Sequence, residues 1–96
     1  MESEFNDYRI LDSALKHGIE EREIDYVLDS KNPTQQYYEL HDDDDENGNA
    51  QDMVVAHTGT RPWPIEVGIS YRDTETVIFH ANKVSEEFSK RYEQEK

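Results

Sequence analysis

Apolar and polar residues alternate most regularly in the last third of the chain. In Ile65–Tyr71 every second residue is apolar, which is the period of a β-strand that buries one face. Thr76–Ala81 repeats the alternation, and a turn centred on Asp73 lies between the two segments. We therefore predict an antiparallel hairpin whose buried face consists of four side chains: Val67, Ile69, Val77 and Phe79.

Two earlier segments are also typical of strands. Thr34–Leu40 is rich in Thr and Tyr, and Asp52–Thr58 contains a run of apolar residues. An acidic stretch with an Asn-Gly dipeptide separates them and indicates a hairpin turn. Because its like charges repel one another, we expect residues 42–51 to be flexible, together with residues 1–7. Tyr8–Leu11 is either a further short strand or an irregular lead into the first helix.

Three segments have the pattern of helices. Asp12–His17 is followed by Gly18, a residue type that commonly ends helices. Glu20–Asp29 places its apolar residues three and four positions apart, on one side of a helix. Ser85 is suited to begin a last helix, because its hydroxyl can accept a hydrogen bond from a backbone amide of the first turn. This C-terminal helix has a narrow apolar stripe, formed by Val84, Phe88 and Tyr92.

Together these elements predict a single domain over residues 1–96, of the α+β class. The predicted order is two short N-terminal helices, an antiparallel meander of three or four strands, and a C-terminal helix. The helices are expected to pack on one face of the sheet. Leu, Ile, Val and Phe supply only 19 of the 96 residues, so we expect a small core of modest stability.

The chain is strongly acidic, with a formal net charge of −13 and a pI of about 4.5. Because neutralising phosphate requires Lys and Arg, this charge disfavours RNA and DNA and favours basic partners. The absence of Cys excludes disulfides and thiolate chemistry. No apolar run approaches the ~20 residues of a membrane span. The acidic start, Met1–Glu4, is unlike a targeting peptide, so we expect a cytoplasmic protein without membrane contact.

Four short segments occur in the order and spacing of a known family. Ala14–Ile19, followed by an acidic helix, is similar to the opening "KHG" motif of BrnT-type toxins of type II toxin–antitoxin systems. Val54–Gly59, Ile65–Val67 and Val77–Ala81 resemble the later strands of that family, and the resemblance spans roughly residues 8–92. It implies a RelE-like fold, cleavage of RNA in active members, and a cognate antitoxin that covers the toxin.

The predicted hairpin brings together residues suited to metal-independent RNA cleavage, which needs a base, an acid and a cation. A symmetric turn places Glu66 opposite His80, on the face away from the predicted core, as a candidate acid–base pair. Arg61 and Lys83 are candidates for the cation that stabilises the phosphate charge, and Arg72 lies at a strand end where it can meet a phosphate. The same Glu–His pair is also an ordinary cross-strand contact.

The residue spacing predicts neither a cofactor nor a metal. Asp43, Asp45, Asn47 and Gly48 match the first half of a calcium-binding loop, but Val54 stands where such a loop needs a bidentate Glu. The four His residues lack the spacing of a zinc site.

Several functions remain open at this level. The resemblance favours a toxin-like endoribonuclease that inhibits translation and is paired with an antitoxin. The alternative is a non-catalytic module on the same fold, whose acidic surface holds a basic protein; mimicry of nucleic-acid charge is a third hypothesis. Trp63, between two prolines, is either a lid over one end of the core or an exposed anchor for a partner.

Overall fold

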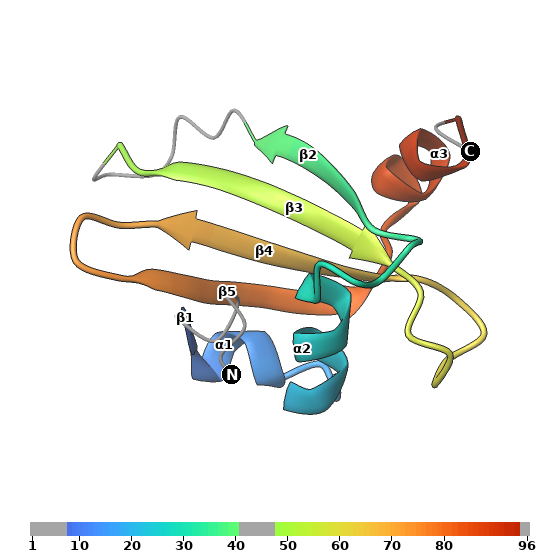
Figure 1. The fold of residues 1–96 in the computed structure, drawn as a ribbon, viewed down its shortest axis with the longest axis horizontal. Coiled ribbons are helices and arrows are strands. Elements are labelled where there is room, and N and C mark those ends of the chain that lie inside the picture. Colours follow the sequence, from blue (N-terminus) through green and yellow to red (C-terminus); the bar gives the residue numbers. More distant parts are fainter. Residues whose placement is uncertain (1–7, 41–47, 95–96) are drawn as a thin grey trace.

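A computed structural model describes residues 8–40 and 48–94 (Figure 1). Residues 1–7, the acidic stretch up to residue 47, and with it most of the half-matching calcium loop, lie outside the described residues. None of the described helices is long and apolar enough to cross a membrane. The elements follow one another in this order: β1 (Tyr8–Ile10), α1 (Asp12–Leu15), α2 (Glu21–Leu28), β2 (Gln36–Leu40), β3 (Ala50–Ala56), β4 (Ile65–Tyr71), β5 (Thr76–Lys83) and α3 (Glu86–Gln94).

The five strands form one mixed sheet in the order β1-β5-β4-β3-β2. Strands β2 to β5 are the predicted meander, each antiparallel to the next. β1 lies parallel to β5, and the Leu11 N–H just after it donates to the Ile78 carbonyl at 2.9 Å. The predicted α+β class is confirmed. The sheet is larger than predicted and not wholly antiparallel, because a strand of three residues is too short to show a period of its own.

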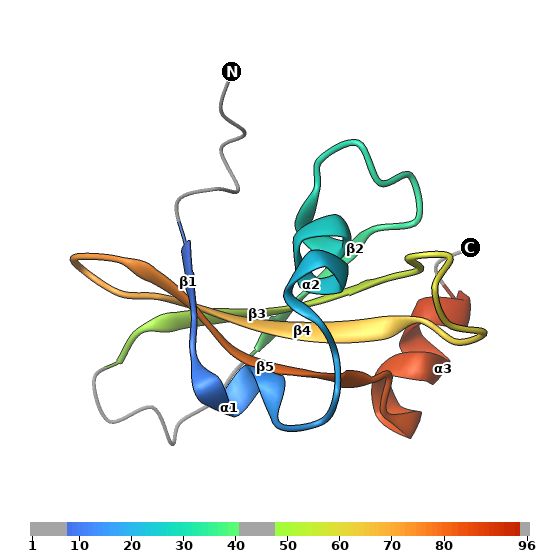
Figure 2. The ribbon, with the colours of Figure 1, turned by 90° about the horizontal axis from the view of Figure 1, so that it is seen from below.

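Helices cover both faces of the sheet, which corrects the prediction of a single covered face (Figure 2). We call the side against α2 the α2 face and the side against α3 the α3 face. A strand buried on both sides has consecutive apolar residues, as β3 has at positions 53–56. The hydrophobic core between the α2 face and its helices consists of Ala14, Ile19, Ile24, Val27, Leu28, Val54, Ala56, Ile65, Val67, Ile69, Ile78 and Ala81. The α3 face is buried with Tyr38, Met53, Val55, Val84, Phe88 and Tyr92.

The pairing of β4 with β5 contains an irregularity between Gly68 and Ile69. Ile69 pairs with Ile78, whereas Gly68 pairs with His80. Phe79 is therefore an extra residue in β5, as in a β-bulge. The bulge changes the phase of the alternation, so that Ile78 and His80 point to opposite faces even though they are two residues apart.

The observed register of the hairpin also corrects the predicted core. Val67 and Ile69 lie on the α2 face as predicted. Val77 is fully buried too, but it pairs with Ser70 and so lies on the α3 face. Phe79 is only partly buried, and the fully buried residue beside it is Ile78. Val77 lies between the turn and the bulge, so its face was mispredicted because the turn itself offsets the pairing by one residue from a symmetric hairpin. The bulge then adds a second offset of one residue.

Replacing Ile78 with Ala should lower the free energy of unfolding by roughly 2–5 kcal/mol, because the side chain is fully buried and its removal leaves a cavity. Phe79→Ala should cost less, since that ring is already partly exposed. Urea denaturation of both variants measures the difference. A larger loss for Phe79→Ala than for Ile78→Ala would contradict the bulged register.

Candidate functional site

Glu66 of β4 and His80 of β5 form a direct pair on the α3 face. The Nε2 atom of His80 lies 2.7 Å from Oε2 of Glu66. The two residues are not opposite each other as predicted, because Glu66 pairs with Asn82 and His80 with Gly68. They meet diagonally on one face, at a separation that side chains of this length span.

The carboxylate of Glu66 is fixed by a second hydrogen bond. Its Oε1 accepts the Ser85 backbone N–H at 2.7 Å, just before the first residue of α3. Burial alone would raise the pKa of Glu66, but the hydrogen bonds from His80 and Ser85 outweigh it and hold the pKa below its usual value. At neutral pH Glu66 is therefore an ionised, 5 % exposed carboxylate that orients His80.

His80 is the accessible member of the pair, with 28 % of its side chain exposed against 7 % for Glu66. With Nε2 on the carboxylate, its other ring nitrogen is left for a second partner. Gly68, which pairs with His80, leaves room for the side chains of Phe79 and His80. A Cβ at position 68 would lie 2.8 Å from Cζ of Phe79 and 3.1 Å from Cβ of His80.

A third residue, His17, adjoins this pair. It is exposed, it follows α1, and its ring lies edge-on to that of His80 with the centroids 6.1 Å apart. Ser13 of α1 holds this helix against β5 by donating to the Phe79 carbonyl at 2.8 Å. Reasoning from the hairpin did not place His17 in the site, because the contact joins segments 63 positions apart; its only signal was its place in the "KHG" motif.

Arg61 and Lys83 gather around Trp63 on the α2 side of the sheet. The Arg61 guanidinium carbon lies 5.5 Å from the centroid of the indole, and Nζ of Lys83 lies 5.7 Å from it. Lys83 pairs with Ile65, so its side chain leaves β5 on the face opposite to His80. Trp63 is partly buried against the core of the α2 face, which confirms the prediction of a lid. The four predicted catalytic residues thus form two groups.

The guanidinium of Arg61 is engaged by a buried glutamate. Its Nε and Nη2 donate to the two carboxylate oxygens of Glu23 at 2.8 and 2.9 Å, and Nη2 also donates to the Gly18 carbonyl. Glu23 additionally accepts from the Thr60 hydroxyl and from the Glu20 backbone N–H, which it caps at the start of α2. The Arg61 hydrogen bond is the largest influence on Glu23 and lowers its pKa to about 2.

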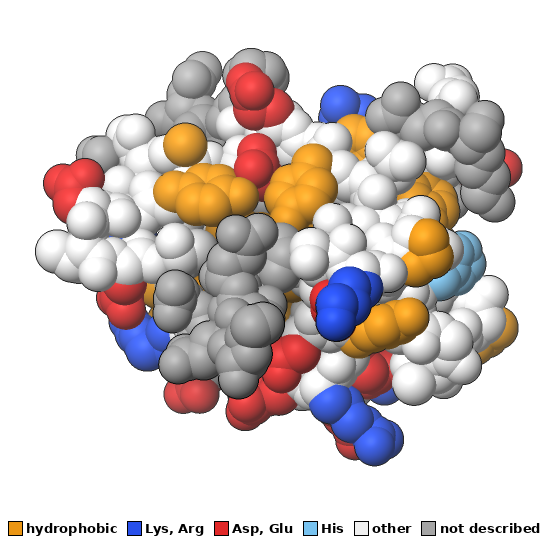
Figure 3. Space-filling view, viewed as in Figure 1, with side chains coloured by type: hydrophobic (Ala, Val, Ile, Leu, Met, Phe, Trp, Pro, Cys, Tyr) orange, Lys and Arg blue, Asp and Glu red, His pale blue; other side chains and the backbone are white. Residues whose placement is uncertain are grey.

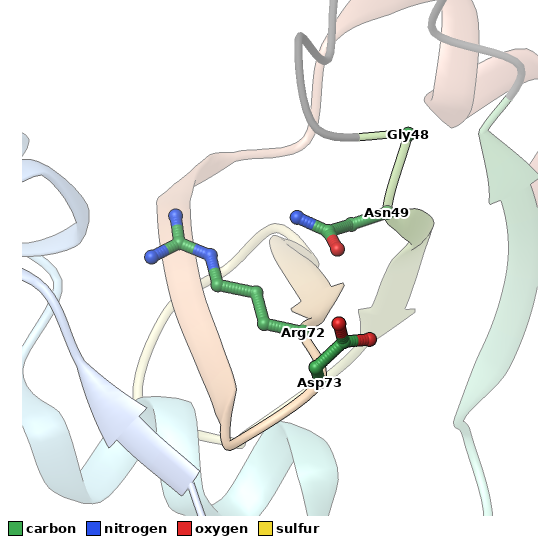
Figure 4. A pocket seen from close by; sticks show the side chains of 4 residues that line it. All are labelled: Gly48, Asn49, Arg72 and Asp73. Atoms are coloured by element: carbon green, nitrogen blue, oxygen red, sulfur yellow. The ribbon is translucent and has the colours of Figure 1, made fainter.

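Arg72 lies at the far end of the hairpin, in the turn after β4. With Gly48, Asn49 and Asp73 it lines an open hollow of about 400 Å³ (Figure 4). In this view its guanidinium extends away from the carboxylate of Asp73. Arg72 lies in the turn that precedes Thr76, the first residue of β5. It therefore does not join the Glu66–His80 pair.

Among the residues that the structure describes, no group of three or more His, Asp or Glu side chains is arranged to hold a metal ion. No family model matches the chain, and no curated protein or solved structure matches it either. The geometry of the His80, Glu66 and His17 cluster is therefore the basis for a functional proposal.

Glu23→Gln should remove a pH-dependent part of the stability. The pKa of Glu23 is lower in the folded chain than its ordinary value of 4.5, so its contribution is complete above about pH 5 and is lost as the pH falls from 4.5 toward 2. The stability difference between wild type and variant should shrink by about 2 kcal/mol over that interval, allowing for the solvent exposure of Arg61. Urea denaturation between pH 7 and pH 2.5 measures this difference in the free energy of unfolding. A difference that stays constant with pH would contradict the ion pair.

Proposed function

We propose that this protein is a toxin-like component of a bacterial toxin–antitoxin module, and that its Glu66–His80 pair cleaves RNA without a metal. One observation carries the proposal. Three of the segments that resemble the toxin family contribute His17, Glu66 and His80, and the first two of these side chains each adjoin the ring of His80 in β5. The resemblance further implies an antitoxin as the cognate partner, and a RelE-like fold is part of the same proposal.

The chemistry follows from the positions of the groups. His80, oriented by the Glu66 carboxylate, accepts the proton of a ribose 2′-hydroxyl while the 2′-oxygen bonds to phosphorus. The bond from phosphorus to the 5′-oxygen breaks, and the leaving oxygen takes a proton from His17. Arg61 and Lys83 lie with Trp63 on the other side of the sheet, away from His80. In this mechanism the protonated imidazole therefore also supplies the positive charge that stabilises the phosphorane.

A second function, a non-catalytic module that holds a basic partner, is favoured by the internal pairing of cations. Arg9 pairs with Glu75, Arg22 with Glu20, and Arg61 with Glu23. These pairs cancel positive charge within the chain and leave the excess of carboxylates to face a partner, in a protein with a net charge of −13.

His80→Ala should reduce RNA cleavage by roughly 10²–10⁴-fold, the usual contribution of one proton-transfer group. Glu66→Gln should also reduce it, while its remaining carbonyl oxygen can still accept the Ser85 N–H. His57→Ala is the matched control, because His57 lies elsewhere, with its ring 5.9 Å from that of Tyr92. Cleavage of purified RNA is measured in the presence of a chelator, and thermal melting verifies that each variant is folded.

The same variants are expressed inducibly in bacteria, with and without the gene adjacent to this one, and growth and RNA integrity are recorded. Wild type should arrest growth and degrade RNA unless the adjacent gene is co-expressed. Cleavage that survives both His80→Ala and Glu66→Gln would refute the site. A wild-type protein without any effect on growth or RNA would refute catalysis and leave the binding module as the function.

A further inference from the structure

The ring of Phe79 lies beside His80 on the α3 face of the sheet. The neighbours of Gly68 in β4, Val67 and Ile69, belong to the core of the α2 face, so a side chain at position 68 would point to the α3 face. A Cβ there would lie 2.8 Å from Cζ and 3.1 Å from Cε1 of Phe79. The ring therefore occupies the place over β4 that a side chain at position 68 would fill.

This ring is not a regular member of the core. It is only partly buried, and among the described residues it belongs to neither of the two hydrophobic clusters that flank the sheet. Its position follows from the bulge, which inserts Phe79 between the core residue Ile78 and the proton-transfer residue His80. An aromatic ring that is open to solvent therefore adjoins the proposed acid–base pair.

The negative charge of the chain favours an uncharged contact as the source of affinity for RNA. Attraction to phosphates supplies most non-specific affinity for nucleic acids, and a net charge of −13 opposes it. Figure 3 shows acidic side chains spread over one face of the molecule, from its upper to its lower edge. Stacking of a base on an aromatic ring needs no cation, so it remains available to a protein of this charge.

His17 and Phe79 approach His80 from different sides. His17 follows α1, which comes after β1, and β1 lies on the side of β5 away from β4. The ring of Phe79 lies on the other side, over Gly68 of β4. In an in-line displacement the attacking and leaving oxygens are on opposite sides of phosphorus. With the leaving 5′-oxygen at His17, the nucleotide that carries the 2′-hydroxyl therefore extends over β4 toward Phe79.

We propose that the Phe79 ring stacks on the base of the nucleotide that carries the attacking 2′-hydroxyl. The base and this hydroxyl are attached to adjacent carbons of one ribose, so a hydroxyl held at His80 brings its base to the neighbouring residue. The inference rests on the proposed RNA cleavage and adds a substrate class to it, single-stranded RNA. Bases in a duplex stack on one another and are not free to reach a ring on a protein surface.

The test uses the full chain and two short synthetic oligonucleotides. In the first, only one nucleotide is a ribonucleotide, so a single bond can be cleaved. The second carries hydrogen in place of the base on that ribose. With a chelator present, Phe79→Leu should lower kcat/KM for the first substrate roughly tenfold, within the range for loss of one base–aromatic stack. It should leave the second substrate within about twofold of wild type, because no base is there to stack.

Tyr26→Leu is the matched control. Tyr26 is also an exposed ring, at 42 %, but it belongs to α2 on the opposite face of the sheet. This variant should leave kcat/KM within about twofold of wild type for both substrates. Thermal melting verifies that each variant is folded.

An oligonucleotide of the same sequence with deoxyribose throughout cannot be cleaved, so it measures the base contact without the reaction. Phe79→Leu should weaken its binding roughly tenfold in an NMR titration, and Tyr26→Leu should not. In wild type the ring protons of Phe79 should shift as the single strand is added. The same sequence annealed into a duplex should bind more weakly than the single strand.

The failure of this inference can be told apart from the failure of the proposed function. Equal losses for Phe79→Leu on the two cleavable substrates would overturn the base contact alone. Equal binding of the uncleavable strand by wild type and Phe79→Leu would do the same. A folded wild type that cleaves neither substrate would overturn the proposed cleavage and, with it, the inference.

Discussion

The extra residue in β5 is the constraint on which the rest of the arrangement depends. In a strand with strict alternation, Ile78 and His80 would share a face, and burying one would bury the other. With Phe79 inserted, Ile78 completes the core under α2 while His80 turns to the α3 face beside Glu66. Gly68 permits this, because it has no side chain to collide with the Phe79 ring. A single strand thereby serves both the hydrophobic core and a polar cluster.

Two buried glutamates connect that sheet to its helices. Glu23 is 3 % exposed and Glu66 is 5 % exposed, and each accepts a backbone N–H at the start of a helix and a hydrogen bond from a basic side chain. A buried carboxylate is tolerated only when its oxygens are satisfied in this way. Glu66 therefore has a structural task besides its proposed chemistry, whereas an ordinary Glu–His pair on a strand surface has none.

The two faces of the sheet carry different polar side chains. On the α3 face, the Glu66 carboxylate holds His80, and these are the groups to which the proposed function assigns proton transfer. On the α2 face, the hydroxyl of Tyr71 on β4 donates to the Asp52 carboxylate on β3. The net charge of −13 opposes the approach of RNA, so the proposed cleavage should depend on ionic strength.

Local patterns determined which segments become helices and strands. Alternation in Ile65–Tyr71 and helical spacing in Glu20–Asp29 identify β4 and α2 to within about one residue, because both depend on neighbours along the chain. The sequence also pointed to Glu66 and His80 as a pair, although the turn and the bulge each displace the predicted register by one residue.

Only the tertiary structure decided which residues meet across the fold. The parallel pairing of β1 and the ion pair between Arg61 and Glu23, which are 38 positions apart, leave no periodic trace in the sequence. The apolar stripe of α3 predicts that this helix packs on something, but not that it packs on the second face of the sheet. The same holds for His17 beside His80. Such contacts are chosen by the packing and charge energies of segments far apart in the chain, and these energies depend on which segments the fold brings together.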